Sequence, residues 1–211
     1  MDIVSSDIHA YSEAHTSPES PLLKQINRET HAVVHMPRML SGHLQGRFLS
    51  MISKMIQPKS ILEIGTYTGY SAICLAEGLA PGGTLVTLDI NEELENRVRN
   101  NFLIAGKTES IDYRIGNALT IIPTLTRTFD LVWIDADKEN YSAYFDLIID
   151  KVRPAGFILA DNVLWSGKVL ETIPDKDAKA IKAFNIKIQT DTRVENVLLP
   201  IRDGIMVMRR I

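Results

Sequence analysis

The stretch that most constrains the fold is SILEIGTYTGYS, residues 60–71. Its apolar run, Ile61 to Ile64, is too short for a long helix and ends at a glycine, which is typical of a buried parallel strand. Gly65 and Gly69 then enclose a tight turn, and apolar residues return with helical spacing over Tyr70 to Leu79. A strand, a glycine turn and a helix in this order open a nucleotide-binding βαβ unit. The glycines allow a ligand to approach the backbone closely, and the helix start offers free N–H groups.

The turn differs from the dinucleotide fingerprint GxGxxG, because Tyr67 stands where the second glycine would be. Glu63 lies inside the strand just before the turn. A carboxylate there disfavours a pyrophosphate and favours a ligand with a positive centre, such as an amine or a sulfonium. Asp89 closes the next expected strand, TLVTLDI, where it can accept hydrogen bonds from both ribose hydroxyls. These residues favour S-adenosylmethionine over the alternative, a strand–turn–helix corner without any ligand.

The composition describes an ordinary soluble α/β domain. The chain has 211 residues, of which 45% are hydrophobic and 23% charged, and its net charge of −3 gives no indication of nucleic acid or an anionic membrane. Cys74, the only cysteine, cannot form an internal disulfide and suits a reducing compartment. The N-terminus lacks the features of a signal peptide, and no apolar segment reaches the ~18 residues that span a bilayer. We therefore expect one cytoplasmic domain, residues 1–211, without nucleic-acid or membrane partners.

Residues 1–57 precede the first strand and have helical patterns, with a break at Ser17–Pro21 and a loop before a helix over His43–Ile56. After the first unit, strands and helices alternate. The expected elements are helices over Asn91–Ala105, Leu119–Leu125, Tyr141–Val152 and Asp177–Gln189, strands over Ser110–Ile115, Phe129–Ile134 and Gly156–Ala160, and a hairpin of Val194–Ile201 and Ile205–Met208 turning at Arg202-Asp203-Gly204. This pattern predicts five parallel strands closed by an antiparallel hairpin, with ligands at the carboxyl ends of the strands.

Acidic side chains follow two of these strands. Asp135 comes directly after one strand, and Asp161 and Asn162 follow the next. Three oxygen ligands without Cys or His suit a hard cation, Mg²⁺ in the first place, with Ca²⁺ or Mn²⁺ as alternatives. A single acidic residue at a strand end more often caps a helix. Three such residues beside a glycine turn favour a metal site.

His31 and His35 are spaced as a metal pair on a helix can be, but the glutamate and third ligand that accompany such pairs are missing from the sequence. We interpret both as surface or packed histidines.

Lys138 follows Asp135 closely enough to share its pocket. Next to a divalent cation a lysine keeps its proton less readily, so it can accept one from a hydroxyl that the metal has made acidic. The alternative is a surface lysine paired with Glu139 or Asp137.

Several segments resemble class I, metal-dependent O-methyltransferases of the caffeoyl-CoA and catechol type, in particular the small bacterial members. The matching segments run nearly end to end: AHTSPESPLL, Met39 with Gln45-Gly46 and Phe48, LEIGTYTGYSA, LVTLD, DLVWIDADKENYSAY, ILADNVLWSGKV and LLPIRDGI. The resemblance implies a Rossmann-like, doubly wound seven-stranded sheet of order 3-2-1-4-5-7-6 with the last strand antiparallel. It also implies that the extra helices of residues 1–57 pack on the core, residues 58–211, and cover the active site.

The same resemblance implies the site residues. The metal ligands of the family fall on Asp135, Asp161 and Asn162, and its proposed base falls on Lys138. Its contacts to the donor, S-adenosylmethionine, fall on Met39, Ser41, Glu63, Gly65, Tyr67, Ser71, Asp89, Ala118, Asp135, Asp137 and Tyr144. Such enzymes methylate one hydroxyl of a vicinal aromatic diol and are commonly dimers. We therefore expect a homodimer that acts on a small phenolic substrate.

Two features leave the acceptor open. The residues before Gln45-Gly46 are Gly42-His43-Leu44, where the family often has Ser-Pro-Glu. The sequence of the loop after Asn162 does not indicate which substrate binds or whether it carries CoA. Two other functions compete with methyl transfer. A nicotinamide-dependent oxidoreductase would share the glycine turn and Asp89 but gives no role to Glu63. A non-catalytic S-adenosylmethionine-binding protein would not need Lys138.

Overall fold

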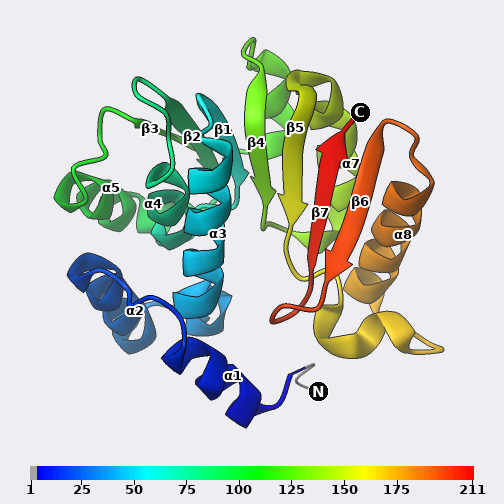
Figure 1. The fold of residues 1–211 in the computed structure, drawn as a ribbon, viewed down its shortest axis with the longest axis horizontal. Coiled ribbons are helices and arrows are strands. Elements are labelled where there is room, and N and C mark those ends of the chain that lie inside the picture. The colour runs from blue at the N-terminus through cyan, green and yellow to red at the C-terminus, as the bar shows by residue number, and fades with distance from the viewer. Residues whose placement is uncertain (1–3) are drawn as a thin grey trace.

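A computed structural model describes residues 4–211 of the chain. Its centre is a seven-stranded sheet of order β3-β2-β1-β4-β5-β7-β6, with helices on both faces (Figure 1). The strands are β1 (Ser60–Ile64), β2 (Thr84–Asp89), β3 (Ile111–Ile115), β4 (Phe129–Ile134), β5 (Val152–Ala160), β6 (Val194–Leu199) and β7 (Ile205–Arg210). The first five are parallel, and β7 runs antiparallel to both β5 and β6. The expected fold class and strand order are therefore confirmed.

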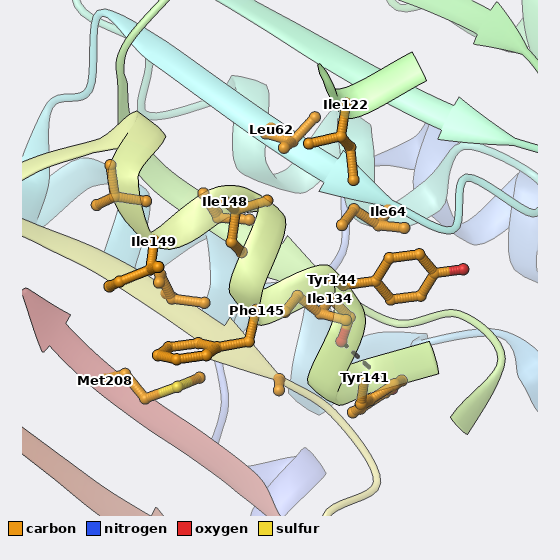
Figure 2. Packing of buried hydrophobic residues seen from close by; sticks show 14 of the residues in the cluster. Leu62, Ile64, Ile122, Ile134, Tyr141, Tyr144, Phe145, Ile148, Ile149 and Met208 are labelled. Carbon is orange, nitrogen blue, oxygen red and sulfur yellow. Dashed lines mark hydrogen bonds between the residues drawn. The ribbon is translucent and has the colours of Figure 1, made fainter. Parts of the chain in front are cut away.

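Helices α6 (Ala118–Ile121), α7 (Tyr141–Ile148) and α8 (Lys176–Thr190) belong to one face of the sheet. Figure 2 shows Phe145 and Ile148 of α7 packed together with Leu62, Ile134 and Met208 of the strands. All five side chains are fully buried. Because side chains alternate along a strand, the neighbours of these strand residues face the opposite layer. Both faces must then be apolar, which explains the continuous apolar runs in the sequence.

The opposite face carries the helices that precede β1 and follow β1 and β2. These helices are α2 (Pro21–Val33), α3 (Gly42–Ile56), α4 (Tyr70–Ala76) and α5 (Glu95–Ile104), with α1 (Ser6–Ala14) lying beyond them (Figure 1). The expected break before α2 is confirmed: the Ser20 hydroxyl accepts the N–H of Leu23, and Pro21 occupies the first helical position. The serine thereby satisfies one of the free N–H groups at the start of the helix. Proline is tolerated at the first position because an N–H there would have no partner within the helix.

Several predicted boundaries were wrong. The helix from Tyr70 ends at Ala76 because Gly78 and Pro81 follow. The helix predicted from Asn91 begins as a separate 3₁₀ turn, η2 (Glu92–Leu94), which the Asn91 side chain caps by accepting the N–H of Glu93. The helix predicted to reach Val152 ends at Ile148 in the 3₁₀ turn η5 (Ile149–Lys151). Strand β5 starts earlier than predicted, at Val152, because its pairing continues through an irregularity opposite Phe129 and Leu131.

The remaining short elements are 3₁₀ turns in the connections. They are η1 (Pro37–Met39), η3 (Ile122–Thr124), η4 (Lys138–Asn140) and η6 (Trp165–Leu170). Helix α2 ends at Val33, so His35 lies beyond it and the two histidines do not share a helical face. Within residues 4–211, none of the helices has the length and hydropathy needed to cross a membrane.

Candidate functional site

A cleft of about 1800 Å³ lies at the carboxyl ends of β1, β2, β4 and β5. Its other wall comes from α1 and from residues 33–41, which connect α2 to α3. Every predicted site residue except Glu63 lines this cleft: Met39, Ser41, Gly65, Tyr67, Ser71, Asp89, Ala118, Asp135, Asp137, Lys138, Tyr144, Asp161 and Asn162. The fold thus brings the predicted donor residues and the predicted metal residues into one continuous space.

Gly65 sits where β1 and β4 come closest. Its φ of +102° is unfavourable for other residues, and a Cβ atom there would lie 1.9 Å from the carbonyl oxygen of Asp135. The Gly65 N–H donates to the carbonyl of Leu88 at 2.8 Å. Glycine is therefore required to bring the ends of the three strands together at the floor of the cleft.

Asp89 holds the glycine turn. Its Oδ2 accepts the backbone N–H groups of Thr66 at 3.0 Å and Tyr67 at 2.6 Å, and its Oδ1 accepts that of Asn91 at 2.9 Å. A carboxylate has about four acceptor positions, so capacity for a ligand hydroxyl remains. The Tyr67 hydroxyl donates to the His35 carbonyl at 3.1 Å and thereby ties the turn to the opposite wall.

Glu63 lies beneath the floor of the cleft. Its side chain is fully buried, and Thr87 Oγ1 donates to its Oε2 at 2.5 Å. Its Oε1 has no hydrogen-bond partner among the residues that the structure describes. Burial raises the pKa of Glu63 to about 8, and the negative charges of Asp135 and Asp89 add to the rise. A positive charge in the cleft above would stabilise its ionised form.

Asp161 and Asp135 end the neighbouring strands β5 and β4. Asp161 is buried, its Oδ2 accepts a hydrogen bond from Gln45 Nε2 at 2.7 Å, and its Oδ1 has no partner within residues 4–211. Burial raises the pKa of Asp161 to about 7, and the nearby charge of Asp135 contributes. Asn162 follows with a left-handed φ of 56°, which turns the chain directly after the strand. The orphaned carboxylate oxygen and the repulsion between the two carboxylates fit a cation between them.

The set of side chains that could bind a metal ion here is small. Among the described residues, no group of three or more His, Cys, Asp or Glu side chains could hold a metal ion. A cation at Asp135 and Asp161 would therefore need the Asn162 amide oxygen and further oxygens from water or substrate. Mg²⁺ commonly keeps several such ligands when it binds to one or two carboxylates.

Lys138 is largely buried beside this pair, with 10% of its side chain exposed. Its Nζ lies 3.3 Å from Asp135 Oδ1 and donates to the Tyr141 hydroxyl at 2.7 Å. The alternative of a surface lysine paired with Glu139 or Asp137 was wrong, because Lys138 is largely buried and Glu139 pairs with Lys176 instead. Asp137 is also engaged elsewhere: it accepts the Tyr144 hydroxyl and the Asn140 amide.

Two residues of the site were not predicted. Arg202, which the sequence placed only in a hairpin turn, donates to Gln45 Oε1 and to the backbone carbonyls of Ser41 and Leu40. Its neighbour Asp203 accepts the N–H of Ser166 and so fixes the start of η6 beside the cleft. The position of these two residues could have been inferred from the predicted antiparallel final strand. A turn between the last two strands must lie at the carboxyl edge of β5 when the final strand is antiparallel to it, which puts Arg202 and Asp203 next to Asp161.

The strand order, the antiparallel final strand and the cleft at the carboxyl edge define the Rossmann-like methyltransferase class. An SAH-bound methyltransferase from Podospora anserina superimposes with a TM-score of 0.90 at 28% identity, over 97% of this chain and 94% of its own. An O-methyltransferase from Bacillus cereus in complex with SAH has a TM-score of 0.89 at 30% identity, over 97% of both chains.

Sequence relatives narrow the class further. A family model described as O-methyltransferase matches residues 13–211. Caffeoyl-CoA O-methyltransferase 2 of Zea mays is 35% identical over 98% of this chain and 84% of its own length. The chain belongs to the O-methyltransferase family. This membership argues against the nicotinamide-dependent oxidoreductase and against a binding protein without catalysis.

Proposed function

We propose that the protein transfers the methyl group of S-adenosylmethionine to one hydroxyl of a catechol-like aromatic diol, which a divalent cation holds in the cleft. The observation that carries this proposal is the continuity of the cleft from the turn at Gly65 and Asp89 to the carboxylates of Asp135 and Asp161. Donor and acceptor can therefore lie side by side, as an in-line displacement at the methyl carbon requires. Such alignment supplies much of the rate of a two-substrate reaction. The SAH in the Bacillus cereus relative supports the donor.

On the donor side, we assign the ribose hydroxyls to the free acceptor capacity of Asp89. Glu63 is buried and does not line the cleft. We therefore assign it an indirect role, in which its negative charge attracts the positive groups of the donor from below. The other donor contacts are assigned to the cleft-lining residues Met39, Ser41, Gly65, Tyr67, Ser71, Ala118, Asp135, Asp137 and Tyr144.

On the acceptor side, Asp135, Asp161 and Asn162 would hold the cation, with Mg²⁺ as the first candidate and Ca²⁺ or Mn²⁺ as alternatives. A cation there would make a bound hydroxyl more acidic and fix its oxygen. Lys138 lies in the cleft next to Asp135 and is our candidate for the group that takes the hydroxyl proton.

The test is turnover of a panel of phenolic diols with isotopically labelled donor and Mg²⁺. We expect a chelator to abolish turnover and leave the affinity for SAH unchanged in calorimetry, because the cation contacts the acceptor. Full turnover by protein verified to be metal-free would contradict the metal role of Asp135, Asp161 and Asn162. Binding of NAD⁺ without binding of S-adenosylmethionine or SAH would contradict the donor.

We further propose that the chain works as one methyltransferase domain, in which residues 1–57 cover the site; residues 1–3 of this segment lie outside the part of the chain that the structure describes. Val4, Ser6 and His9 support this proposal, since they line the cleft from the N-terminal side. A cytoplasmic location and a homodimer stay predictions. The acceptor is proposed only as a small phenolic diol, with or without CoA.

A further inference from the structure

We propose that Gln45 and Arg202 are positioning residues that orient the Asp161 carboxylate toward a divalent cation. This inference rests on the proposed metal role of Asp161. The three side chains form one line of hydrogen bonds, from the β6–β7 turn through α3 to the end of β5. They lie far apart in the chain, and the fold alone brings them together.

The chemistry of the guanidinium group fixes the direction of this line. Arginine carries only donors, so the atom of the Gln45 amide that faces Arg202 must be its oxygen. The amide nitrogen of Gln45 must then face Asp161, and it donates to Oδ2 at 2.7 Å. Gln45 is fully buried, so water does not compete for either bond. Arg202 therefore determines which way the amide points.

The result at Asp161 is a carboxylate with two different oxygens. Oδ2 is occupied by a donor of fixed direction, and Oδ1 is buried without a partner among the described residues. An unpaired buried carboxylate oxygen is unfavourable unless a ligand uses it. The bond from Gln45 thus leaves Oδ1 as the oxygen that a cation would take. Partners of metal ligands act in this way in many metal sites, where they fix the orientation of the ligand.

Arg202 also reaches the donor side of the cleft. Its guanidinium donates to the carbonyl of Leu40 at 3.3 Å and to the carbonyl of Ser41. Both residues lie in the segment that carries the predicted donor contacts Met39 and Ser41. One side chain therefore holds the donor segment and, through Gln45, the metal carboxylate.

A merely structural tie between the hairpin and α3 would lower the melting temperature but would not change how the folded protein binds metal. The decisive measurement is therefore Mn²⁺ affinity by calorimetry, without donor or acceptor, below the melting temperature of every variant. The variants are Gln45→Met, Arg202→Met and the double variant. Arg209→Met is the matched control, since it removes a guanidinium paired with Glu195 on the same hairpin.

We expect Gln45→Met to bind Mn²⁺ ~10–100-fold more weakly, as is typical when the partner of a metal ligand is lost. Its affinity for SAH should stay that of the wild type. Arg202→Met should weaken both Mn²⁺ and SAH. The double variant should bind Mn²⁺ no worse than Gln45→Met, because Arg202 orients Asp161 through Gln45.

Wild-type Mn²⁺ affinity in both single variants would overturn this inference and leave the proposed metal site intact. Failure of the wild-type protein to bind Mn²⁺ would overturn the metal site and this inference with it. If Gln45→Met does not fold, Arg202→Met decides the matter, because Arg202 is only half-buried.

Discussion

At the scale of single residues, the buried carboxyl of Glu63 predicts a proton linked to donor binding. Burial raises its pKa to about 8, so the carboxyl is largely protonated at neutral pH in the ligand-free protein. A sulfonium or ammonium in the cleft favours the ionised form. We expect donor binding at neutral pH to release a proton, which calorimetry detects as a dependence of the binding enthalpy on the ionisation enthalpy of the buffer.

The direction of the pH effect follows from the same shift. Donor affinity should increase as pH rises toward about 8 and then level off, because above that pH Glu63 is already ionised without ligand. The stability of the ligand-free protein should change in the opposite direction and decrease as pH rises. The folded pKa is raised above the unfolded value of 4.5, so stability from this group is lost as pH rises through about 8. Glu63→Gln should remove the contribution of this group to both effects, and proton release that persists unchanged in that variant would exclude Glu63 as its source.

Lys138 is the second residue whose role can be tested directly. Lys138→Met should lower kcat by ~10²–10⁴-fold if the lysine takes the hydroxyl proton. The KM of either substrate should change little, because Lys138 is assigned no part in binding them. Lys176→Met is a suitable control, since Lys176 forms an exposed ion pair with Glu139 nearby.

The pH dependence of that defect separates two roles. A defect that is large at low pH and fades as the acceptor hydroxyl ionises by itself supports proton transfer. An equal defect at every pH indicates that Lys138 instead compensates the charge of Asp135, with which it pairs at 3.3 Å. Unchanged kcat across the whole range would remove Lys138 from the mechanism.

At the scale of elements, the turn between β1 and α4 depends on Asp89 at the end of β2. Asp89→Ala should weaken donor binding by about 2–3 kcal/mol, since hydrogen bonds to charged groups are the stronger kind. It should also lower the melting temperature, because the N–H groups of Thr66 and Tyr67 lose their acceptor. Asp112→Ala on β3 is the control, since its carboxylate pairs with Arg114 outside the cleft. Equal SAH affinity in Asp89→Ala and the wild type would contradict the donor assignment.

The elements themselves were largely predictable. β4 coincides with its predicted range, Phe129–Ile134, because a strand buried on both faces needs an uninterrupted apolar run. Helix ends were harder. The turn after Asn91 is a 3₁₀ turn, and a propensity pattern over the range does not distinguish that turn from the first turn of an α-helix.

The site was predictable wherever a residue ends a strand, because topology alone places such residues in the cleft. Asp135 and Asp161 are of this kind. The contacts of Gln45 were not predictable, because its partners Asp161 and Arg202 are 116 and 157 residues away in the chain. No local pattern encodes a contact of that range. The position of Glu63 below the cleft was not predictable either, because it depends on a tertiary contact, the hydrogen bond from Thr87.

At the scale of the whole molecule, one face of the sheet predicts how two copies meet. Figure 1 shows β5, β7 and β6 facing the viewer without a helix in front of them. Val197 of β6 is 51% exposed and lies opposite Val207, which packs against the core on the α3 side. Met51 and Met55 of α3 are 57% and 74% exposed. A stable dimer covers about 800 Å² on each partner, and this face is our candidate for it.

We expect light scattering after size exclusion to give the mass of a dimer. Val197→Lys should shift the protein toward monomer, since a charge buried without a partner is unfavourable in an interface. Ile186→Lys is the control, because Ile186 is 59% exposed on α8, which belongs to the other face. A monomeric wild-type protein at all concentrations would contradict the homodimer.

The bond from Arg202 back to Ser41 spans 161 residues, and this span has a consequence for how the enzyme is made. A nascent chain emerges N-terminus first, at about 5–20 residues per second. Every residue assigned to donor, metal and proton transfer precedes β6, so all of them are synthesised before the hairpin that carries Arg202. Until that hairpin pairs with β5, the Gln45 amide has no guanidinium to orient it. If Arg202 positions Asp161 as proposed, we expect the site to reach its final arrangement only after translation of the final strand, so that a chain stalled before β6 has all the assigned side chains but lacks their final orientation.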